Sequence, residues 1–236
     1  TPRFDPATAS RRFRVVMFDM ATVTLLPRLI ARLHELAPGV DLEVVPMNVD
    51  RVTAWLRAEE VDAAIMVPRE AAADIRTRPL FRDELVSVVR DGHPLAKRDQ
   101  VSLDEFSRWP HATIRLTGRE PGSLDAALKE AGVERRVSLQ VPYFLAAPAL
   151  VSATDFVMSI PRSAAVAFGS HWPIARFPPP LPAHQFTVHL LWSRTQDADP
   201  AQQWFRSELT NIAETTPGIV AGPSALAEEL RSLAAG

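Results

Sequence analysis

The side chains in this sequence that could bind a small molecule come directly after predicted strands, where loops lead into helices. Asp19, Met20 and Thr22 follow the β-rich run 13–17 and precede a helical pattern. The N–H groups and positive dipole end of a helix N-terminus attract carboxylates. The carboxylate of Asp19 would repel an anion, so a phenolic or neutral ligand fits this position better. Asp19 or Thr22 could instead serve only as a helix N-cap.

Two further predicted strands end in side chains that could form one wall of a ligand cleft. Met66, Val67 and Pro68 close a nearly all-apolar run, and Asn48 follows the strand before it. Apolar runs of this kind are more often ordinary core than binding surface, because such residues are usually buried. The sequence leaves both interpretations open.

A second group of candidates lies in the second half of the chain. Tyr143 is the only tyrosine, and its ring could stack on an aromatic ligand and donate a hydrogen bond, or could be structural with its hydroxyl at the surface. Arg162 could pair with a ligand carboxylate in a bidentate fork, cap a helix, or pair with a surface carboxylate. Thr117 and Gly118 offer a hydroxyl and a close backbone approach, or only a turn.

Patterns for catalysis and metal binding are absent from the sequence. The chain has no cysteine, which excludes disulfides, thiolate metal sites and a cysteine nucleophile. Its six histidines show no zinc-binding spacing, and no phosphate-binding Walker loop or dinucleotide fingerprint is present. The stretch around Ser123 lacks the second glycine of a nucleophile elbow. We therefore expect no catalytic residue, no metal and no cofactor.

Composition narrows the class of partner. The 236 residues are 47% hydrophobic with a net charge of -2, enough apolar residues for a core in one domain or two small lobes. Nucleic-acid binding usually needs clustered Lys and Arg, and the longest cationic cluster is the short segment 11–14. No stretch approaches the roughly 18 to 20 apolar residues of a membrane span. The lack of cysteine fits a cytoplasmic location.

Alternating strands and helices must position the candidate residues. Residues 1–12 are predicted to be a polar linker with two prolines. Residues 13–67 follow the order β-α-β-α-β, which indicates a parallel sheet covered by helices. Apolar residues at spacings of three and four predict the first helix over 25–36, with Thr22 or Thr24 as its cap.

The rest of the chain repeats the β/α alternation. Two strands are predicted at 75–81 and 84–89, and Ser102 begins a short helix with capping-box spacing. The last segment, 215–236, is predicted to be a weak helix or disordered. Two β/α halves joined by extended segments suggest two lobes, and the cleft between such lobes is the usual ligand site.

Short segments along the chain resemble the effector domain of LysR-type transcriptional regulators. The resemblance rests on the order and spacing of segments 4–8, 12–14, 25–29, 38–40, 62–65, 92–95, 160–162, 192–194 and 199–204. It covers about residues 4 to 214 and is closest to the subgroup that senses aromatic acids and flavonoids.

The resemblance implies an α/β, two-lobed, periplasmic-binding-protein-like (type 2) fold with two subdomains joined by crossover strands. Subdomain I would comprise 13–89 plus 186–214, subdomain II would comprise 90–185, and 215–236 would be a C-terminal tail. It also implies an effector pocket between the subdomains and a homodimer or tetramer. DNA would be contacted only through a helix-turn-helix domain missing from this chain, and no membrane would be involved.

The expected pocket residues are mostly apolar or aromatic, which favours an aromatic or largely apolar effector over a highly charged one. The candidate ligand-binding residues are Phe18, Asp19, Met20, Thr22, Asn48, Met66, Val67, Pro68, Thr117, Gly118, Tyr143, Phe144, Pro161 and Arg162. Two other functions stay open. One is an exported solute-binding protein of a transport system, and the other is an enzyme on the same scaffold.

Overall fold

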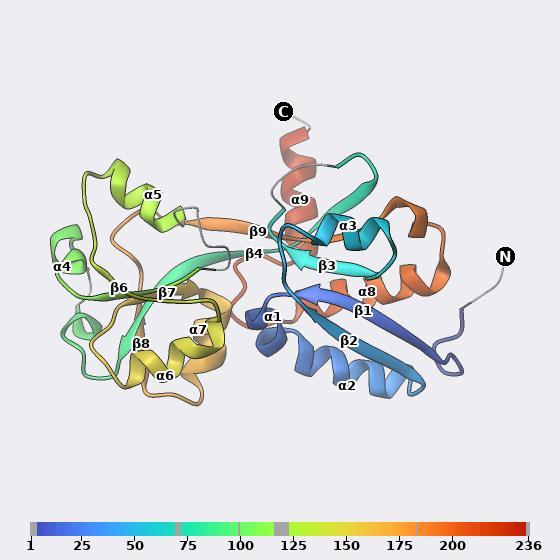
Figure 1. Ribbon diagram of the computed structural model, residues 1–236, viewed down its shortest axis with the longest axis horizontal. Coiled ribbons are helices and arrows are strands. Elements are labelled where there is room, and N and C mark those ends of the chain that lie inside the picture. Colours follow the sequence, from blue (N-terminus) through green and yellow to red (C-terminus); the bar gives the residue numbers. More distant parts are fainter. Residues whose placement is uncertain (1–3, 69–71, 99, 116–122, 183, 235–236) are drawn as a thin grey trace. The chain divides into compact units, whose positions relative to one another are not determined.

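The computed structural model describes residues 4–68, 72–98, 100–115, 123–182 and 184–234. The chain divides into two compact units, which we call unit 1 (1–82 and 187–236) and unit 2 (83–186). The strands β4 (Ile75–Arg90) and β9 (Gln185–Ser193) each have residues in both units, so the chain passes from one unit to the other along these strands (Figure 1). None of the helices in the described ranges is long and apolar enough to cross a membrane.

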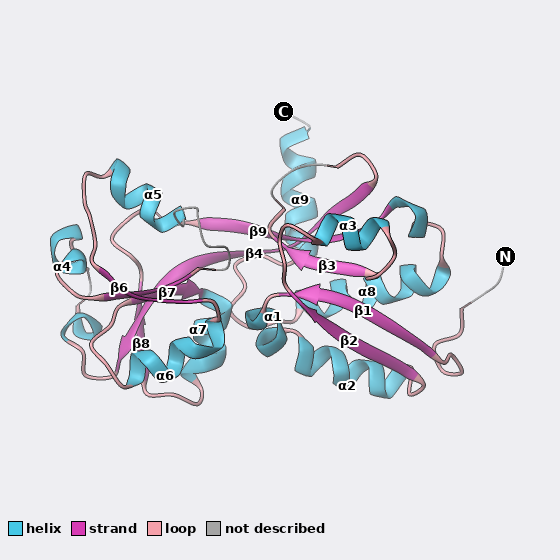
Figure 2. Ribbon diagram, viewed as in Figure 1, coloured by secondary structure: helices cyan, strands magenta, loops and turns pink. Residues whose placement is uncertain are grey.

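Unit 1 has a sheet covered by helices (Figure 2). Its strand order is β2-β1-β3-β9-β4, with β1 parallel to β2 and β3, and β9 antiparallel to β3. Besides β4 and β9, its elements are β1 (Arg11–Met17), α1 (Asp19–Thr24), α2 (Leu26–Leu36), β2 (Val40–Pro46), α3 (Val52–Arg57), β3 (Ala63–Met66), η3 (Arg194–Gln196), α8 (Pro200–Glu214) and α9 (Pro223–Ala234).

Side-chain alternation along β1 gives the two faces of this sheet different coverings. Val16 packs with Val52 and Leu56 of α3 in a buried cluster on one face. On the other face the ring of Phe13 stacks on Phe205 of α8, with ring centroids 4.3 Å apart, and α8 packs against α2. The sheet of unit 1 is therefore enclosed between helices, as the alternation of strands and helices predicts.

Unit 2 is built around the second half of β4. There, β4 pairs antiparallel with β7 and β8, and β5 pairs parallel with β6. The remaining elements of unit 2 are η1 (Pro94–Lys97), α4 (Leu103–Ser107), β5 (His111–Ile114), α5 (Ser123–Glu130), β6 (Val137–Val141), η2 (Phe144–Ala146), α6 (Ala147–Ser152), β7 (Met158–Pro161), α7 (Arg162–Gly169) and β8 (Ile174–Phe177). The capping box predicted at Ser102 is confirmed, since its hydroxyl accepts the backbone N–H of Glu105.

Two sequence predictions about these elements were wrong. The strands expected at 75–81 and 84–89 form one continuous strand, because the polar residues between them cause no break and Asp83 is buried with hydrogen-bond donors. Thr22 and Thr24 do not cap a helix. The helical turns begin at Asp19 with Phe18 as the N-cap, and the Thr22 hydroxyl donates to the carbonyl of Asp19 inside the first turn.

Candidate ligand-binding site

Three parallel strands of unit 1 end at the same edge of the sheet. Met17 at the end of β1 lies opposite Pro46 of β2 and Ile65 of β3. The segments that follow these strands therefore emerge together at one edge. Several of the predicted site residues are thereby brought to this edge: Phe18, Asp19, Asn48, Met66, Val67 and Pro68.

A small hollow of about 260 Å³ lies on the α3 side of this edge. Met66, Pro68 and Leu191 form an apolar floor, and the polar side chains of Asp50 and Thr53 lie at its rim. Phe18 and Val49 pack against the same apolar cluster without being fully buried. The hollow can therefore accept a compact ligand with an apolar body and a polar group.

Not every predicted residue of this group faces the hollow. Met20 is only 5% exposed and belongs to the core, whereas Val67 is 43% exposed. Asn48 acts through its backbone carbonyl, which accepts the N–H groups of Arg51 and Val52 at 3.0 and 3.1 Å. Met66 and Pro68 are the predicted residues that line the hollow directly.

His189 is a candidate that the sequence did not reveal. It lies directly opposite Met66 in the β3–β9 pairing, so both side chains project from the same face of the sheet. Its Nδ1 atom is buried and has no hydrogen-bond partner among the described residues. Burial lowers the pKa of His189, which keeps the imidazole neutral at pH 7. Met66 lines the hollow, and a buried nitrogen without a hydrogen-bond partner is uncommon in a protein core.

The sequence alone could not identify His189 as a site residue. The sequence places it in a long predicted strand, but not opposite Met66, because the register of two strands distant in the sequence is set by tertiary packing. A histidine alternating with apolar residues is otherwise typical of a half-buried strand.

Unit 2 presents a second set of predicted residues at the ends of its own strands. β5 runs parallel to β6, and His111 at its start forms a parallel bridge to Val157 just before β7. Tyr143 follows β6 and is 62% exposed, with Phe144 partly buried beside it. Thr117 and Gly118 lie outside the described residues.

Arg162 begins α7 directly after Pro161, which is buried. Its guanidinium group lies 2.8 Å from Glu84, and its side chain is 49% exposed. This is the surface pair that the sequence left open as an alternative, although a half-exposed ion pair is weak enough to exchange partners.

Among the other buried polar groups of unit 2, His111 has a structural partner, whereas the Nε2 atom of His93 has none in the described part of the chain. His111 is fully buried, and its Nε2 lies 2.9 Å from the carbonyl of Phe106. Burial lowers the pKa of His111 to about 4, and the nearby cation of Arg135 acts in the same direction. Within the described part of the chain, no group of three or more His, Asp or Glu side chains could hold a metal ion.

Comparisons with known proteins agree on one family. Residues 6–213 match the model described as the LysR substrate binding domain. The HTH-type transcriptional activator NagR of Ralstonia sp is 28% identical over 203 residues, which cover 86% of this chain and 67% of that protein. Nodulation protein D 3 of Rhizobium leguminosarum bv. phaseoli is 30% identical over 217 residues, which cover 91% of this chain and 71% of that protein.

A solved structure gives the same result. The regulatory domain of MexT, a transcriptional activator in Pseudomonas aeruginosa, is similar with a TM-score of 0.76 and 29% sequence identity. The match covers 87% of this chain and 100% of that chain.

Proposed function

Because the chain belongs to the LysR substrate binding domain family, the effector-binding part of LysR-type transcriptional regulators, we propose that it senses an aromatic or largely apolar effector. In unit 1 the effector would bind in the hollow at the common edge of β1, β2 and β3. The observation that carries this proposal is the pairing of Met66, which lines the hollow, with His189, whose buried Nδ1 atom has no hydrogen-bond partner among the described residues.

The proposed contacts are of two kinds, apolar packing on the floor of the hollow and a hydrogen bond from His189. An aromatic body would cover Met66 and Leu191, which favours burial of an apolar ring. An N–H on the enclosed Nδ1 of His189 would have no acceptor, so we place its proton on Nε2. That N–H would donate to a carbonyl, carboxylate or phenolic oxygen of the effector.

The residues of unit 2 enter the proposal separately. Tyr143 would stack on the effector, since it is the most exposed aromatic side chain in the described part of its unit and follows a strand end. Arg162 would exchange Glu84 for a ligand carboxylate if the effector is an acid. That both units hold the same effector stays a prediction.

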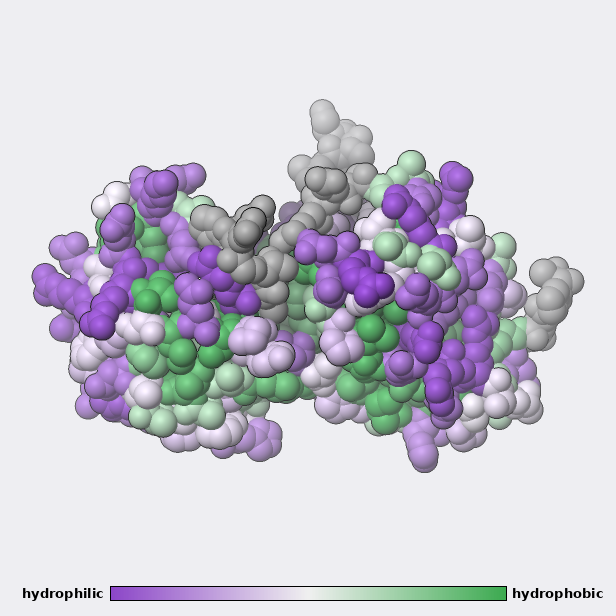
Figure 3. All heavy atoms as spheres, in the orientation of Figure 1, coloured by the Kyte–Doolittle hydropathy of each residue, from purple (hydrophilic) through white to green (hydrophobic). Residues whose placement is uncertain are grey.

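The bound state would be read by a helix-turn-helix domain outside this chain, in a cytoplasmic homodimer or tetramer. Figure 3 shows apolar side chains over α2 of unit 1, where Ile30 is 44% exposed, and over α6 and α7 of unit 2. We propose the helix faces within 20–36 and 162–168 as the surfaces for a second copy. Family membership does not favour the transport alternative, and the relatives are transcriptional regulators rather than enzymes.

A thermal-shift screen tests the sensing function. Benzoate, salicylate and phenol should be compared with acetate, an acid that lacks the large apolar body. A ligand that binds only the native state raises the melting temperature. We expect a rise with at least one aromatic compound and none with the control, and a screen without any rise would contradict the proposal.

One substitution locates the site. Thr53→Lys places a long charged side chain at the rim of the hollow and should abolish the shift. Thr77→Lys, at an exposed position of the same unit, should leave it unchanged. If the rise in melting temperature persists in Thr53→Lys, the ligand binds somewhere other than this hollow.

A further inference from the structure

The C-terminal segment 216–234 lies beyond the residues that match the family, and it returns to the sheet of unit 1. In this unit β9 is the one strand of the described ranges that pairs with β4, so the other side of β4 is the sheet edge there. The C-terminal segment covers that edge at Arg82. The Arg82 N–H donates to the carbonyl of Ala221 at 2.7 Å, and the Arg82 carbonyl accepts the N–H of Val220 at 2.9 Å.

Side chains hold the same contact. The guanidinium group of Arg82 lies 2.8 Å from the carboxylate of Glu229 on α9. Leu226, on the same helix, is only 3% exposed. The hydroxyl of Thr216, which is buried, donates to the carbonyl of Ile212 at 2.9 Å and fixes the start of the segment on α8. Backbone pairing, an ion pair and apolar burial therefore act together.

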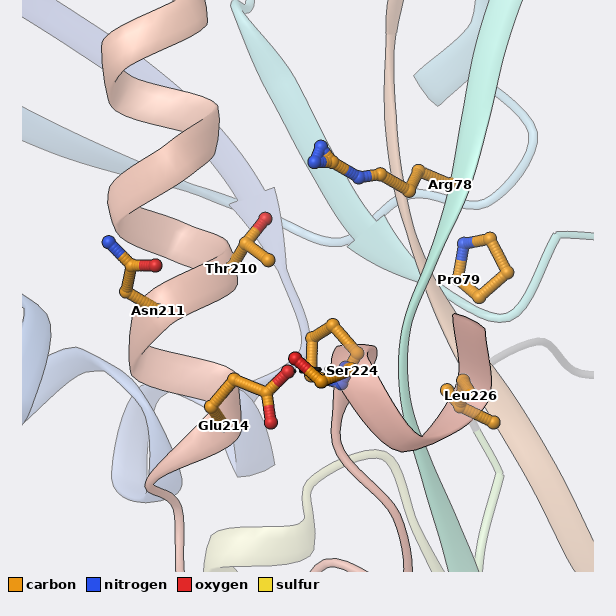
Figure 4. Close-up of a pocket in the computed structure, with 8 residues that line it drawn as sticks. Arg78, Pro79, Thr210, Asn211, Glu214, Ser224 and Leu226 are labelled. Carbon is orange, nitrogen blue, oxygen red and sulfur yellow. Dashed lines mark hydrogen bonds between the residues drawn. The ribbon is translucent and has the colours of Figure 1, made fainter. Parts of the chain in front are cut away.

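The turn before α9 depends on Glu214 and Gly222. The carboxylate of Glu214 accepts the backbone N–H of Ser224 at the start of α9. A Cβ atom added at Gly222 would lie 2.6 Å from that carboxylate and 3.3 Å from the Cα of Glu214. Figure 4 shows Glu214 of α8 pointing to Ser224, beside a cavity of about 280 Å³ that Arg78 and Leu226 also line.

We propose that segment 216–234 is an intramolecular strap that fixes β4 at Arg82, the last residue of unit 1 before the chain continues into unit 2. The strap closes the open edge of β4 at this single residue, and it restrains the backbone where the strand leaves the unit. This role requires no effector, so its test is independent of the sensing function.

Amide hydrogen exchange of the full chain, followed by NMR without added ligand, tests the strap. The Arg82 N–H reports the contact directly, because its acceptor is Ala221. Glu229→Gln removes the ion pair and should accelerate exchange at Arg82 about two- to fivefold, as expected for a partly exposed pair. Gly222→Ala places a Cβ atom where the Glu214 carboxylate lies and close to the Glu214 Cα, so it should break the bond from Ser224 to Glu214 and accelerate exchange at Arg82 by roughly tenfold or more.

Matched controls come from the same chain. Glu228→Gln removes an equal charge from the neighbouring exposed position, and Gly169→Ala adds a Cβ where no atom lies within 4 Å. Both should leave exchange at Arg82 unchanged. If Gly222→Ala does not fold, Leu226→Ala replaces it. Unchanged exchange at Arg82 in the strap variants would overturn the proposal, and so would an equal acceleration at the core amide of Phe13.

Discussion

Arg82 and Asp83 are consecutive residues of β4, yet each is anchored within a different unit. The backbone of Arg82 pairs with Ala221 in unit 1. The carboxylate of Asp83 is fully buried and accepts the hydroxyl of Ser163, at the start of α7 in unit 2, at 2.6 Å. Adjacent positions of one strand are thus fixed independently, one by the C-terminal segment and one by α7.

The anchor at Asp83 gives the first prediction. Ser163→Ala removes a donor to a buried carboxylate and should lower the free energy of unfolding by about 1–3 kcal/mol at pH 7. Burial raises the pKa of Asp83, and the Ser163 hydroxyl opposes that rise by stabilising the ionised form. The loss should therefore shrink as the pH falls and the carboxyl group becomes protonated. Urea unfolding at several pH values measures it.

Ser170→Ala is the matched control for this substitution. Ser170 is exposed and donates only to the carbonyl of Val166, at 3.4 Å. It should change the free energy of unfolding by less than about 0.5 kcal/mol. A loss in Ser163→Ala that does not depend on pH would contradict the assigned bond to a charged Asp83.

His111 gives a prediction for acid. Its folded pKa of about 4 lies below the value near 6.5 expected for an unfolded histidine. The unfolded state therefore binds more protons between these values, and stability falls as the pH drops from about 6.5 to 4. The contribution is on the order of 3 kcal/mol.

Unfolding of the wild type and of His111→Gln at pH 7 and pH 4.5 measures the contribution of His111. The variant should lose less stability than the wild type over this range. His34→Gln, at an exposed position, controls for the loss of an imidazole group. Equal losses in the wild type and in His111→Gln would show that another group causes the acid sensitivity.

The aromatic residues of unit 2 give a prediction for binding. Tyr143→Phe and Phe144→Ala should each weaken the affinity for the aromatic compound identified by thermal shift, by roughly three- to tenfold in calorimetry. Leu145→Ala is the control, because Leu145 is a neighbouring side chain that is 47% exposed. If both variants fold and bind with unchanged affinity, Tyr143 and Phe144 do not contact the ligand.

The family and its two-subdomain α/β fold could be predicted from sequence, and solved regulatory domains confirm both. Local patterns were sufficient for this, because parallel strands with intervening helices bring strand ends such as Met17 and Met66 to one edge. The continuity of β4 could not be predicted. Asp83 can be buried within β4 because the hydroxyl of Ser163 donates a hydrogen bond to its carboxylate. These two residues are far apart in the sequence.

The same limit applies to the site and the C-terminal segment. Met66 and Pro68 could be predicted at the hollow because they end a strand, but His189 gains its position only from its pairing with β3. The helical pattern of 223–234 is readable, whereas its docking at Arg82 is not, since an edge strand offers no sequence signal for its partner.

His189 gives the last prediction. If Nε2 donates to the effector, His189→Phe should weaken binding of an aromatic acid about tenfold, the effect of losing one hydrogen bond in a protected site. His189→Gln keeps an N–H donor and should stay within about threefold of the wild type. His34→Phe, at an exposed position of unit 1, should bind like the wild type.

The pH dependence of binding separates a neutral donor from a cation. Since burial lowers the pKa of His189, its imidazole is neutral at pH 8 and at pH 7, and the affinity for benzoate should be the same at both values. A cationic His189 would instead bind the acid more tightly at the lower pH. Calorimetry at pH 8 and pH 7 distinguishes them, and a severalfold gain in affinity at pH 7 that disappears in His189→Gln would contradict the neutral donor.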